Sequence, residues 1–430
     1  MLISGWGGYP TVKANVSTPS SAQNCELLGN AALIPRGMGR SYGDSSLAPN
    51  VLQTKRLDHF LAFEPVTGLL TVEAGVTIRE ILRLVVPKGW FVPVTPGTSY
   101  VTIGGAIASD VHGKNHHLAG TFGQHVVSMN ILLGSGEVVY TSPQHLPDLF
   151  HATCGGMGLT GLVLSATIQL QPLSSVMVHQ TTLKSSCLEA VCEQFEAQQH
   201  STYSVAWIDC LAQGSSLGRS VLMLGEHDTE GSLSLKVKEP LTVPFYTPAA
   251  LLNSASMKAF NQLYYAKAQH GRKQSVHLLP YFYPLDAIGG WNKLYGKPGF
   301  LQYQFVVPKE HGVKHMKTML QEISKAGTGS FLAVLKQFGR GNNNLLSFPK
   351  EGYTLALDFK MTDSTVALIH RLDDMLLNMG GRVYLTKDAV MKASTFKATY
   401  PTWEAFESVR HKFGAVGKFA SVQSKRLGLL

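Results

Sequence analysis

The 430-residue chain is 44 % hydrophobic and carries a formal net charge of +9, a composition typical of a globular protein long enough for two domains with buried cores. No apolar run reaches the ~20 residues that cross a bilayer, and the N-terminus lacks the charged-then-apolar pattern of a signal peptide, so we expect a cytoplasmic protein. The basic residues are scattered and form no stripe with interleaved aromatics, which argues against a nucleic-acid partner. The net positive charge instead favours phosphate groups or lipid head groups as anionic partners.

The first informative segment is a glycine-rich turn between apolar stretches. Gly37, Gly39 and Gly43 permit backbone conformations that a β-carbon opposes, so backbone N–H groups there can lie against a pyrophosphate. Ser41 and Tyr42 add hydroxyl donors. Taken alone, Gly, Ser and Asp in such a run also suit an ordinary surface turn. We expect a dinucleotide cofactor to contact the whole segment, which comprises Pro35, Arg36, Gly37, Met38, Gly39, Arg40, Ser41, Tyr42, Gly43, Asp44 and Ser45.

Two regular elements and a second small-residue segment come next. Alternating residues over 68–77 predict a strand and turn, and the apolar spacing over 78–86 predicts an amphipathic helix. Residues 96–113 are mostly small, and small side chains let backbone approach a flat ring closely, although a tight helix or strand crossing also selects them. With the first segment, this run favours a flavin. The expected contacts are Gly97, Thr98, Thr102, Ile103, Gly104, Gly105, Ser109 and His112.

A third glycine motif, from Gly156 to Gly161, matches the G-x-G-x-x-G string of nicotinamide-binding Rossmann units letter for letter. That fingerprint must follow a strand and open a helix. Here residues 147–152 are typical of a helix and residues 162–170 of a strand, which is the reverse order. We therefore expect no nicotinamide cofactor at this motif.

The middle of the chain adds fewer signals. Residues 188–198 predict another helix. The segment from Ser254 to Lys273 mixes basic residues with aromatic and aliphatic ones, a combination that suits a membrane surface and equally a solvated helix. His112, His116 and His117 form a histidine cluster, but no Cys or carboxylate accompanies it at ligand spacing, so no metal site is predicted.

These segments resemble the FAD-binding oxidoreductases of the vanillyl-alcohol oxidase type, and within that family the branch of decaprenylphosphoryl-β-D-ribose 2-oxidases. The resemblance rests on residues 4–7, 112–117 and 299–305 together with the two glycine segments, and so runs nearly from end to end. It implies an α+β fold of two domains, with the active site in the cleft between them, where ligand pockets preferentially lie. Residues 1–176 and 382–430 would form a vanillyl-alcohol-oxidase-type (PCMH) FAD-binding domain, and residues 177–381 an α+β substrate-binding domain.

The same resemblance implies a reaction. It is the FAD-dependent oxidation of the 2′-hydroxyl of a polyprenylphosphoryl-β-D-ribose to the 2′-keto form, the first half of an epimerisation to the arabinose form. A separate reductase of the short-chain dehydrogenase type would complete it, and the lipid-linked sugar phosphate implies peripheral contact with the inner membrane face. Many relatives bond the flavin covalently through a histidine in the first glycine segment. Arg40 stands at that position, and because a guanidinium lacks the required nucleophilicity, FAD is expected to be non-covalent.

Matched positions also assign roles to single residues. Lys387 and His112 are expected to be catalytic, Lys387 by stabilising reduced flavin or orienting the sugar hydroxyl; as a base it would need a lowered pKa. Gln304, Lys336 and Lys387 are the expected substrate contacts, and Lys336 would pair with the phosphodiester. Val163 and Tyr384 complete the expected flavin contacts.

Three positions in the expected sugar pocket depart from mycobacterial members of the branch. Ala356, Phe282 and Thr354 stand where those members carry cysteine, tyrosine and asparagine, and lost polar groups matter in a desolvated site. A soluble sugar-alcohol or aldonolactone oxidase of the same superfamily is therefore the alternative, although such relatives generally show the covalent-flavin histidine. A flavin-binding scaffold without catalysis is a third hypothesis, which the retained Lys387 and His112 oppose.

Overall fold

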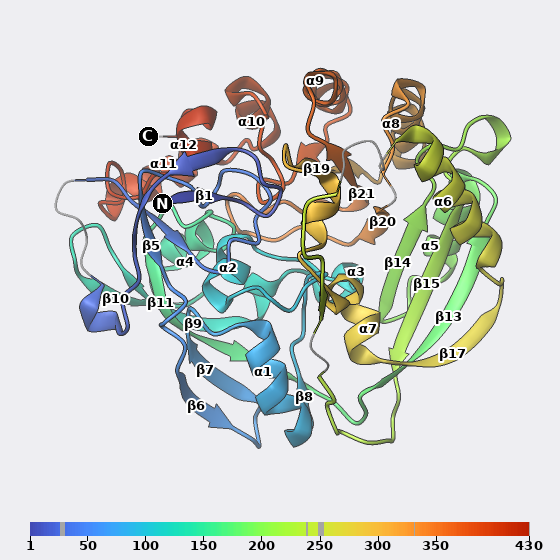
Figure 1. Ribbon diagram of the computed structural model, residues 1–430. Coiled ribbons are helices and arrows are strands. Elements are labelled where there is room, and N and C mark those ends of the chain that lie inside the picture. Colours follow the sequence, from blue (N-terminus) through green and yellow to red (C-terminus); the bar gives the residue numbers. More distant parts are fainter. Residues whose placement is uncertain (26–30, 238–239, 248–252, 331, 430) are drawn as a thin grey trace.

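A computed structural model describes residues 1–25, 31–237, 240–247, 253–330 and 332–429. The described chain combines helices and sheets in two parts that lie side by side (Figure 1). One part contains the N-terminal strands and the C-terminal helices, and the other is built on a large antiparallel sheet (Figure 1). The expected α+β fold is confirmed.

The first part holds two small sheets. The parallel three-stranded sheet has the order β3 (Asn15–Ser17), β5 (Asn50–Gln53), β4 (Ile34–Arg36). The antiparallel five-stranded sheet has the order β10 (Val138–Thr141), β9 (Val126–Leu132), β11 (Leu162–Gln169), β7 (Leu69–Glu73), β6 (Phe60–Glu64). Helices α10 (Ala393–Thr399), α11 (Trp403–Lys412) and α12 (Val422–Leu427) return the C-terminus to the N-terminal strands (Figure 1).

The second part is an eight-stranded antiparallel sheet. Its order is β17 (Arg272–His277), β13 (Met177–Ser185), β15 (Ser220–His227), β14 (Tyr203–Ile208), β20 (Ala333–Phe338), β21 (Gly352–Lys360), β19 (Phe300–Pro308), β22 (Arg382–Val383). Helices α5 (Leu188–Ala197), α8 (Gly312–Ala326) and α9 (Asp363–Asn378) pack on this sheet. Further elements are β1 (Leu2–Ser4), β2 (Thr11–Lys13), β8 (Trp90–Phe91), β12 (Gln171–Pro172), β16 (Leu241–Thr242), β18 (Ile288–Gly289), α3 (His116–Ala119), α6 (Ser254–Lys267) and α7 (Leu278–Phe282).

Strand alternation decides which residues of the large sheet face the helices and which face the first part. Successive side chains of a strand point to opposite faces. On β19, Tyr303 and Phe305 join the apolar core with the helices, while Gln302 and Gln304 point to the other face. The neighbouring strands β20 and β21 alternate in the same way, so Lys336 and Asp358 share the cavity face with Gln302 and Gln304, while Gln337 lies on the helix face and donates to Glu196 of α5.

The predicted local elements are found. Residues 78–86 form α1 (Ile78–Val85) and a short continuing turn, and the helix begins with a capping box in which the Thr77 side chain and Glu80 exchange hydrogen bonds with each other's backbone N–H groups. Residues 188–198 form α5, and residues 69–73 form β7. The Gly156–Gly161 motif follows α4 (Pro147–Thr153) and precedes β11, so its order is helix then strand, the reverse of a Rossmann unit.

The strands of the large sheet span residues 177–383, close to the predicted substrate-binding domain. The difference lies at the second boundary. Arg382 and Val383, which the prediction gave to the FAD-binding domain, form β22 and pair with β19. The chain therefore leaves the large sheet directly before the turn that carries Lys387, which places this lysine between the two parts.

Candidate active site

A cavity of about 730 Å³ lies between the two parts of the molecule. This volume is within the range of small-molecule and cofactor sites, roughly 300–1,000 Å³. The predicted site residues that line it are Pro35, Arg36, Gly37, Met38, Gly39, Arg40, Ser41, Tyr42, Ser45, Gly97, Thr98, Thr102, Gly104, Gly105, Ser109, His112, Val163, Gln304, Lys336, Tyr384 and Lys387. Three predicted cofactor contacts, Gly43, Asp44 and Ile103, are not among the lining residues.

The two glycine segments touch each other along one wall of this cavity. A β-carbon on Gly37 would lie 2.2 Å from Oγ1 of Thr102, so only glycine permits this approach. Gly39 has a φ of +63°, and a β-carbon there would lie 2.2 Å from Nη2 of Arg36. That nitrogen donates to the carbonyl oxygen of Ser4 at 2.7 Å. Arg36 therefore fixes the shape of the first segment, in addition to any charge that it offers to a ligand.

Asp44 and Gly43 lie behind the wall and connect it to the C-terminal helix. The Asp44 carboxylate accepts two hydrogen bonds from Arg426 on α12, at 3.0 and 2.8 Å. Arg426 also donates to Asp388 at 2.8 Å. A β-carbon on Gly43 would lie 1.9 Å from the carbonyl oxygen of Asp388, so the first segment and the turn near Lys387 are packed backbone to backbone.

The second glycine segment enters the short helix α2 (Ile103–Ala108). Oγ1 of Thr102 caps it by accepting a hydrogen bond from the N–H of Gly105 at 3.2 Å. Ile103 points into the core and is fully buried. Gly97 lies in the same segment, and open space surrounds its α-carbon: no atom lies within 4 Å of its ideal β-carbon position. The cavity therefore reaches the backbone at Gly97, as a ring lying against a glycine requires.

Asp286 joins the second glycine segment to the other part of the molecule. Its carboxylate accepts hydrogen bonds from Oγ1 of Thr98 at 2.6 Å and from the N–H of Ser99 at 2.7 Å. The sequence analysis did not single out this residue, since its partners are 187 and 188 positions away. Asp286 therefore connects the two walls of the cavity by hydrogen bonds.

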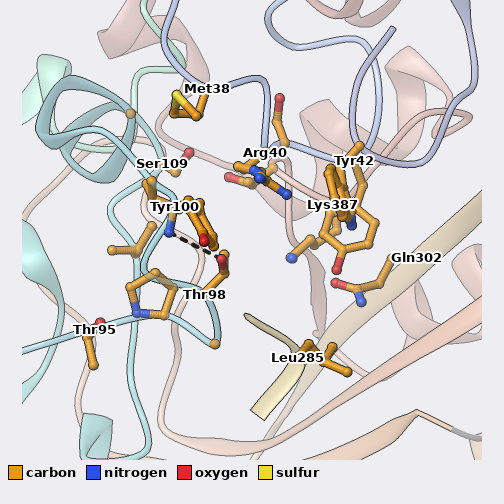
Figure 2. Close-up of a pocket in the computed structure, with 18 of the residues that line it drawn as sticks. Met38, Arg40, Tyr42, Thr95, Thr98, Tyr100, Ser109, Leu285, Gln302 and Lys387 are labelled. Atoms are coloured by element: carbon orange, nitrogen blue, oxygen red, sulfur yellow. Dashed lines mark hydrogen bonds between the residues drawn. The ribbon is translucent and has the colours of Figure 1, made fainter. Parts of the chain in front are cut away.

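Arg40 lies near Tyr100 in the wall of the cavity (Figure 2). Its guanidinium carbon lies 3.9 Å from the ring centre of Trp6 and 5.2 Å from that of Tyr100. Burial lowers its pKa, and its Nε has no hydrogen-bond partner among the described residues. Asp286 acts on this half-buried guanidinium only through its charge, with no ion pair between them among the described residues, so Arg40 fits an anionic ligand such as a pyrophosphate.

His112 forms a hydrogen-bonded pair with Gln304 across the two parts. The Gln304 amide donates to Nε2 of His112 at 3.0 Å and to Oγ1 of Thr354 at 3.3 Å. Burial, together with the charges of Lys336 and Lys387, holds the pKa of His112 well below its usual range. The ring is therefore neutral, with Nε2 as acceptor and the proton on Nδ1.

Lys387 and Asp358 are two buried ionisable groups, and the charge of each shifts the pKa of the other. Nζ of Lys387 lies 3.7 Å from the ring centre of Tyr42, beside Gln302 (Figure 2). Gln302 donates a hydrogen bond to the Asp358 carboxylate. Burial lowers the pKa of Lys387 to about 7, against the opposing effect of Asp358, and burial raises the pKa of Asp358 to about 7. The pair can therefore accept or release a proton near neutral pH.

The histidine cluster does not converge on one point. His116 packs on Phe338 with ring centres 4.4 Å apart, while Nε2 of His117 is 2.8 Å from the carbonyl oxygen of Ser201. Within the ranges that the structure describes, no group of three His, Cys, Asp or Glu side chains is arranged to hold a metal ion.

The sequence analysis missed three charged lining residues: Asp286, Asp358 and Lys114. A signal for Asp358 was present, because alternation along residues 353–359 places it on the same face of β21 as Ala356 and Thr354. No comparable pattern marks Lys114, which lies in a turn, or Asp286, which lies in the short 3-10 helix Pro284–Ala287.

Comparisons with known proteins agree with the geometry. A model of an FAD-binding domain matches residues 12–142. Decaprenylphosphoryl-β-D-ribose oxidase of Mycolicibacterium smegmatis is 37 % identical over 100 % of this chain and 97 % of its own length. L-gulono-1,4-lactone dehydrogenase of Mycobacterium tuberculosis is 20 % identical over 99 % of both chains. D-arabinono-1,4-lactone oxidase of Yarrowia lipolytica is 30 % identical over 29 % of this chain and 24 % of its own.

Proposed function

The chain belongs to the family of FAD-binding oxidoreductases that includes decaprenylphosphoryl-β-D-ribose oxidase, and on that premise we propose that it oxidises the 2′-hydroxyl of a polyprenylphosphoryl-β-D-ribose to a ketone. It is an FAD-dependent enzyme, and the flavin supplies the hydride acceptor. The observation that carries the substrate proposal is the gathering of Lys387, Gln304 and Lys336 in the cavity that the two glycine segments border. Together these groups offer a proton acceptor, a hydrogen-bond acceptor for the sugar at Oε1 of Gln304, whose two N–H groups already donate to His112 and Thr354, and a cation for phosphate.

Different residues of the cavity would bind the cofactor and act on the substrate. The backbone of the glycine segments and Arg40 would hold the FAD pyrophosphate, and Gly97 would lie against the ring system. The cofactor is held non-covalently, because Arg40 replaces the histidine that could bond to it. Neutral Lys387 accepts the proton of the sugar hydroxyl, and the His112–Gln304 pair orients the sugar.

The three departures from mycobacterial relatives have different consequences. Thr354 keeps a polar role, because its hydroxyl accepts from Gln304 and donates to the carbonyl oxygen of Phe305 at 2.8 Å. Ala356 and Phe282 line the cavity without offering a polar side chain. Sugar recognition therefore rests on the amides of Gln302 and Gln304 on β19.

Product analysis tests the proposed reaction. With an artificial electron acceptor, the protein is expected to convert polyprenylphosphoryl-β-D-ribose to a product lacking two hydrogens, and borohydride is expected to reduce that product to a mixture of ribose and arabinose forms. If the protein oxidises free alditols or aldonolactones and leaves the phosphoryl ribose unchanged, the result would support the alternative function, a soluble sugar-alcohol or aldonolactone oxidase. The keto product itself requires reduction, so we propose a reductase of the short-chain dehydrogenase type as the partner.

An apolar rim beside the cavity supports contact with a membrane surface. Leu263 and Phe260 on α6 are 70 % and 44 % exposed, and Phe245 and Leu241 in the preceding segment are 69 % and 85 % exposed. Phe260 also lines the cavity, so the rim borders its opening. Within the described chain, no helix combines the length and apolar character needed to cross a bilayer. We propose that the rim touches the membrane that carries the lipid-linked substrate.

Charged substitutions in the rim test this contact. The double variant Phe245→Glu/Leu263→Glu is expected to bind vesicles containing an anionic lipid at least about tenfold more weakly, because burying one such side chain contributes about 1.5–3 kcal/mol. Vesicle sedimentation measures the binding. Leu61→Glu/Val66→Glu, near β6 at positions 53 % and 93 % exposed, is the matched control and is expected to bind as the wild type does. Equal binding by both double variants would refute the rim as the contact.

A further inference from the structure

The carboxylate of Asp110, two residues after helix α2, is fully buried. Its Oδ1 accepts a hydrogen bond from the backbone N–H of Gly123 at 2.9 Å. Its Oδ2 accepts hydrogen bonds from the side chains of Asn342 at 2.8 Å, Asn344 at 2.9 Å and Ser347 at 2.6 Å. All four donors are neutral groups. A buried charge is costly unless such donors replace its water, so the surroundings of this carboxylate are built for it.

The hydrogen bonds of Asp110 join the two parts of the molecule. Residues 342–347 connect β20 to β21 in the large sheet, whereas Asp110 belongs to the first part. Asn342 also donates to Oγ1 of Thr121 in the first part, at 2.7 Å. A β-carbon on Gly123 would lie 2.7 Å from Oδ1 of Asp110, so only glycine permits the close packing at this point. The carboxylate is therefore the centre of a contact that fixes one connection of the large sheet to the first part.

The backbone turns sharply at Asp110. Its φ is +39°, in the left-handed region that favours glycine, although aspartate and asparagine tolerate it better than most other residues. The N–H of Asp110 donates to the carbonyl oxygen of Ile107 at 3.0 Å. The N–H of Val111 donates to that of Ala106 at 3.1 Å. The turn therefore ends α2 and leads the chain to residue 112 in a direction that a continuing helix could not take.

The residues on either side of this turn face the cavity. Ser109 and His112 line it, and Figure 2 shows Ser109 in its wall. The carbonyl oxygen of Ser109 accepts a hydrogen bond from the hydroxyl of Tyr384 at 2.9 Å. Nε2 of His112 accepts the hydrogen bond from Gln304. Asp110 itself is not among the described residues that line the cavity, so it can act on a substrate only through its neighbours.

We propose that Asp110 is a positioning residue for the oxidation, a role that rests on the proposed function. Its carboxylate holds the connection between β20 and β21 against the first part and fixes the turn, so that the ring of His112 meets Gln304 in the geometry that orients the sugar. Asp110→Asn isolates this role, because asparagine also tolerates the left-handed backbone but replaces one carboxylate oxygen by an N–H group. In either orientation of the amide, that group faces another N–H donor.

The test measures two properties of the holoenzyme. One is the rate of flavin reduction by polyprenylphosphoryl-β-D-ribose under anaerobic conditions. The other is the nuclear magnetic resonance spectrum of isotope-labelled histidine side chains, which needs no substrate. The signals of His112 are identified by their loss in His112→Ala, and the position of its ring is then followed in each variant.

Three further variants make the test specific. The exchange Asp110→Asn/Asn344→Asp is the rescue, since the amide at position 110 can then donate to the carboxylate at position 344. Ser347→Ala removes one donor to Asp110 and is the second variant should Asp110→Asn not fold. Asp58→Asn makes the same chemical change at an exposed position and is the control.

Asp110→Asn is expected to lower the rate of flavin reduction about tenfold to a hundredfold, as a small misplacement near the reacting groups does, and to shift the signals of His112. Ser347→Ala should change both properties in the same direction by less. The exchange variant should return both toward the wild-type values, and Asp58→Asn should leave them unchanged. Because Asp110 acts through His112, adding Asp110→Asn to His112→Ala should slow the reaction further by less than about twofold.

Equal slowing by Asp110→Asn in the presence and absence of the His112 side chain would show a merely structural role and overturn the proposal. Wild-type rates in both Asp110→Asn and Ser347→Ala would refute it as well. A wild-type flavin that the phosphoryl ribose does not reduce would refute the proposed function instead. The histidine spectrum then decides on Asp110 alone: shifted His112 signals in Asp110→Asn support the positioning role, and unchanged signals refute it.

Discussion

Replacing Lys387 by methionine is expected to lower the rate of flavin reduction by about 10²- to 10⁴-fold, the usual contribution of a positioned acid or base. The variant loses the group that accepts the hydroxyl proton but keeps a side chain of similar length over the Tyr42 ring. Its FAD content should therefore stay at the wild-type level. Stopped-flow absorbance after mixing with polyprenylphosphoryl-β-D-ribose under anaerobic conditions measures the rate.

The pH dependence identifies the role of Lys387. Burial lowers its pKa to about 7, and only the deprotonated amine accepts a proton, so the wild-type rate should rise with pH through about 7 and then level off. Asp358 acts to raise that pKa, so Asp358→Asn should move the rise to lower pH. Lys392→Met, at an exposed position near the turn, is the control. A wild-type rate that falls as pH rises through 7 would show that the charged ammonium is required instead.

Replacing Gly97 by phenylalanine is expected to give a folded protein with at least about tenfold lower affinity for FAD. The ideal β-carbon position of Gly97 meets no atom within 4 Å, so the side chain has room in the protein itself. It would occupy the space in which we place the ring system, and overpacking of this kind costs typically about 1–3 kcal/mol. Absorbance of the acid-soluble fraction measures the cofactor and also shows whether FAD is released without a covalent bond.

Two comparisons make the Gly97 result interpretable. Val66→Phe adds the same ring at a position 93 % exposed and should keep its flavin. Far-ultraviolet circular dichroism should be the same for both variants and the wild type. Full flavin content in Gly97→Phe would contradict the placement of the second glycine segment at the cofactor, and flavin that stays with the acid precipitate would contradict non-covalent binding.

Local elements could be predicted from the sequence because their signals are local. The helix Ile78–Val85 has both its apolar spacing and its Thr77–Glu80 cap within one segment. The reversed order of helix and strand around Gly156–Gly161 was also readable, since each element has its own periodicity. Lys387 and Gln304 were found through the family resemblance, because neither has a pattern of its own.

Contacts between distant segments could not be predicted. Asp286 meets Thr98 and Ser99, and Lys114 meets Phe282, only after the large sheet has folded against the first part. Asp44 shows the opposite problem: it lies inside the first glycine motif, yet its carboxylate binds Arg426 and does not line the cavity. The sequence motifs therefore predicted which segments form the wall of the cavity. Which side chains of these segments face the cavity depends on the packing of the two parts and could not be predicted.

The visible spectrum of the purified protein under anaerobic conditions tests the central claim most directly. We expect a yellow protein whose flavin band bleaches on addition of polyprenylphosphoryl-β-D-ribose and stays unchanged with free alditols or aldonolactones. Bleaching by free polyols alone, or a protein without a flavin band, would contradict it.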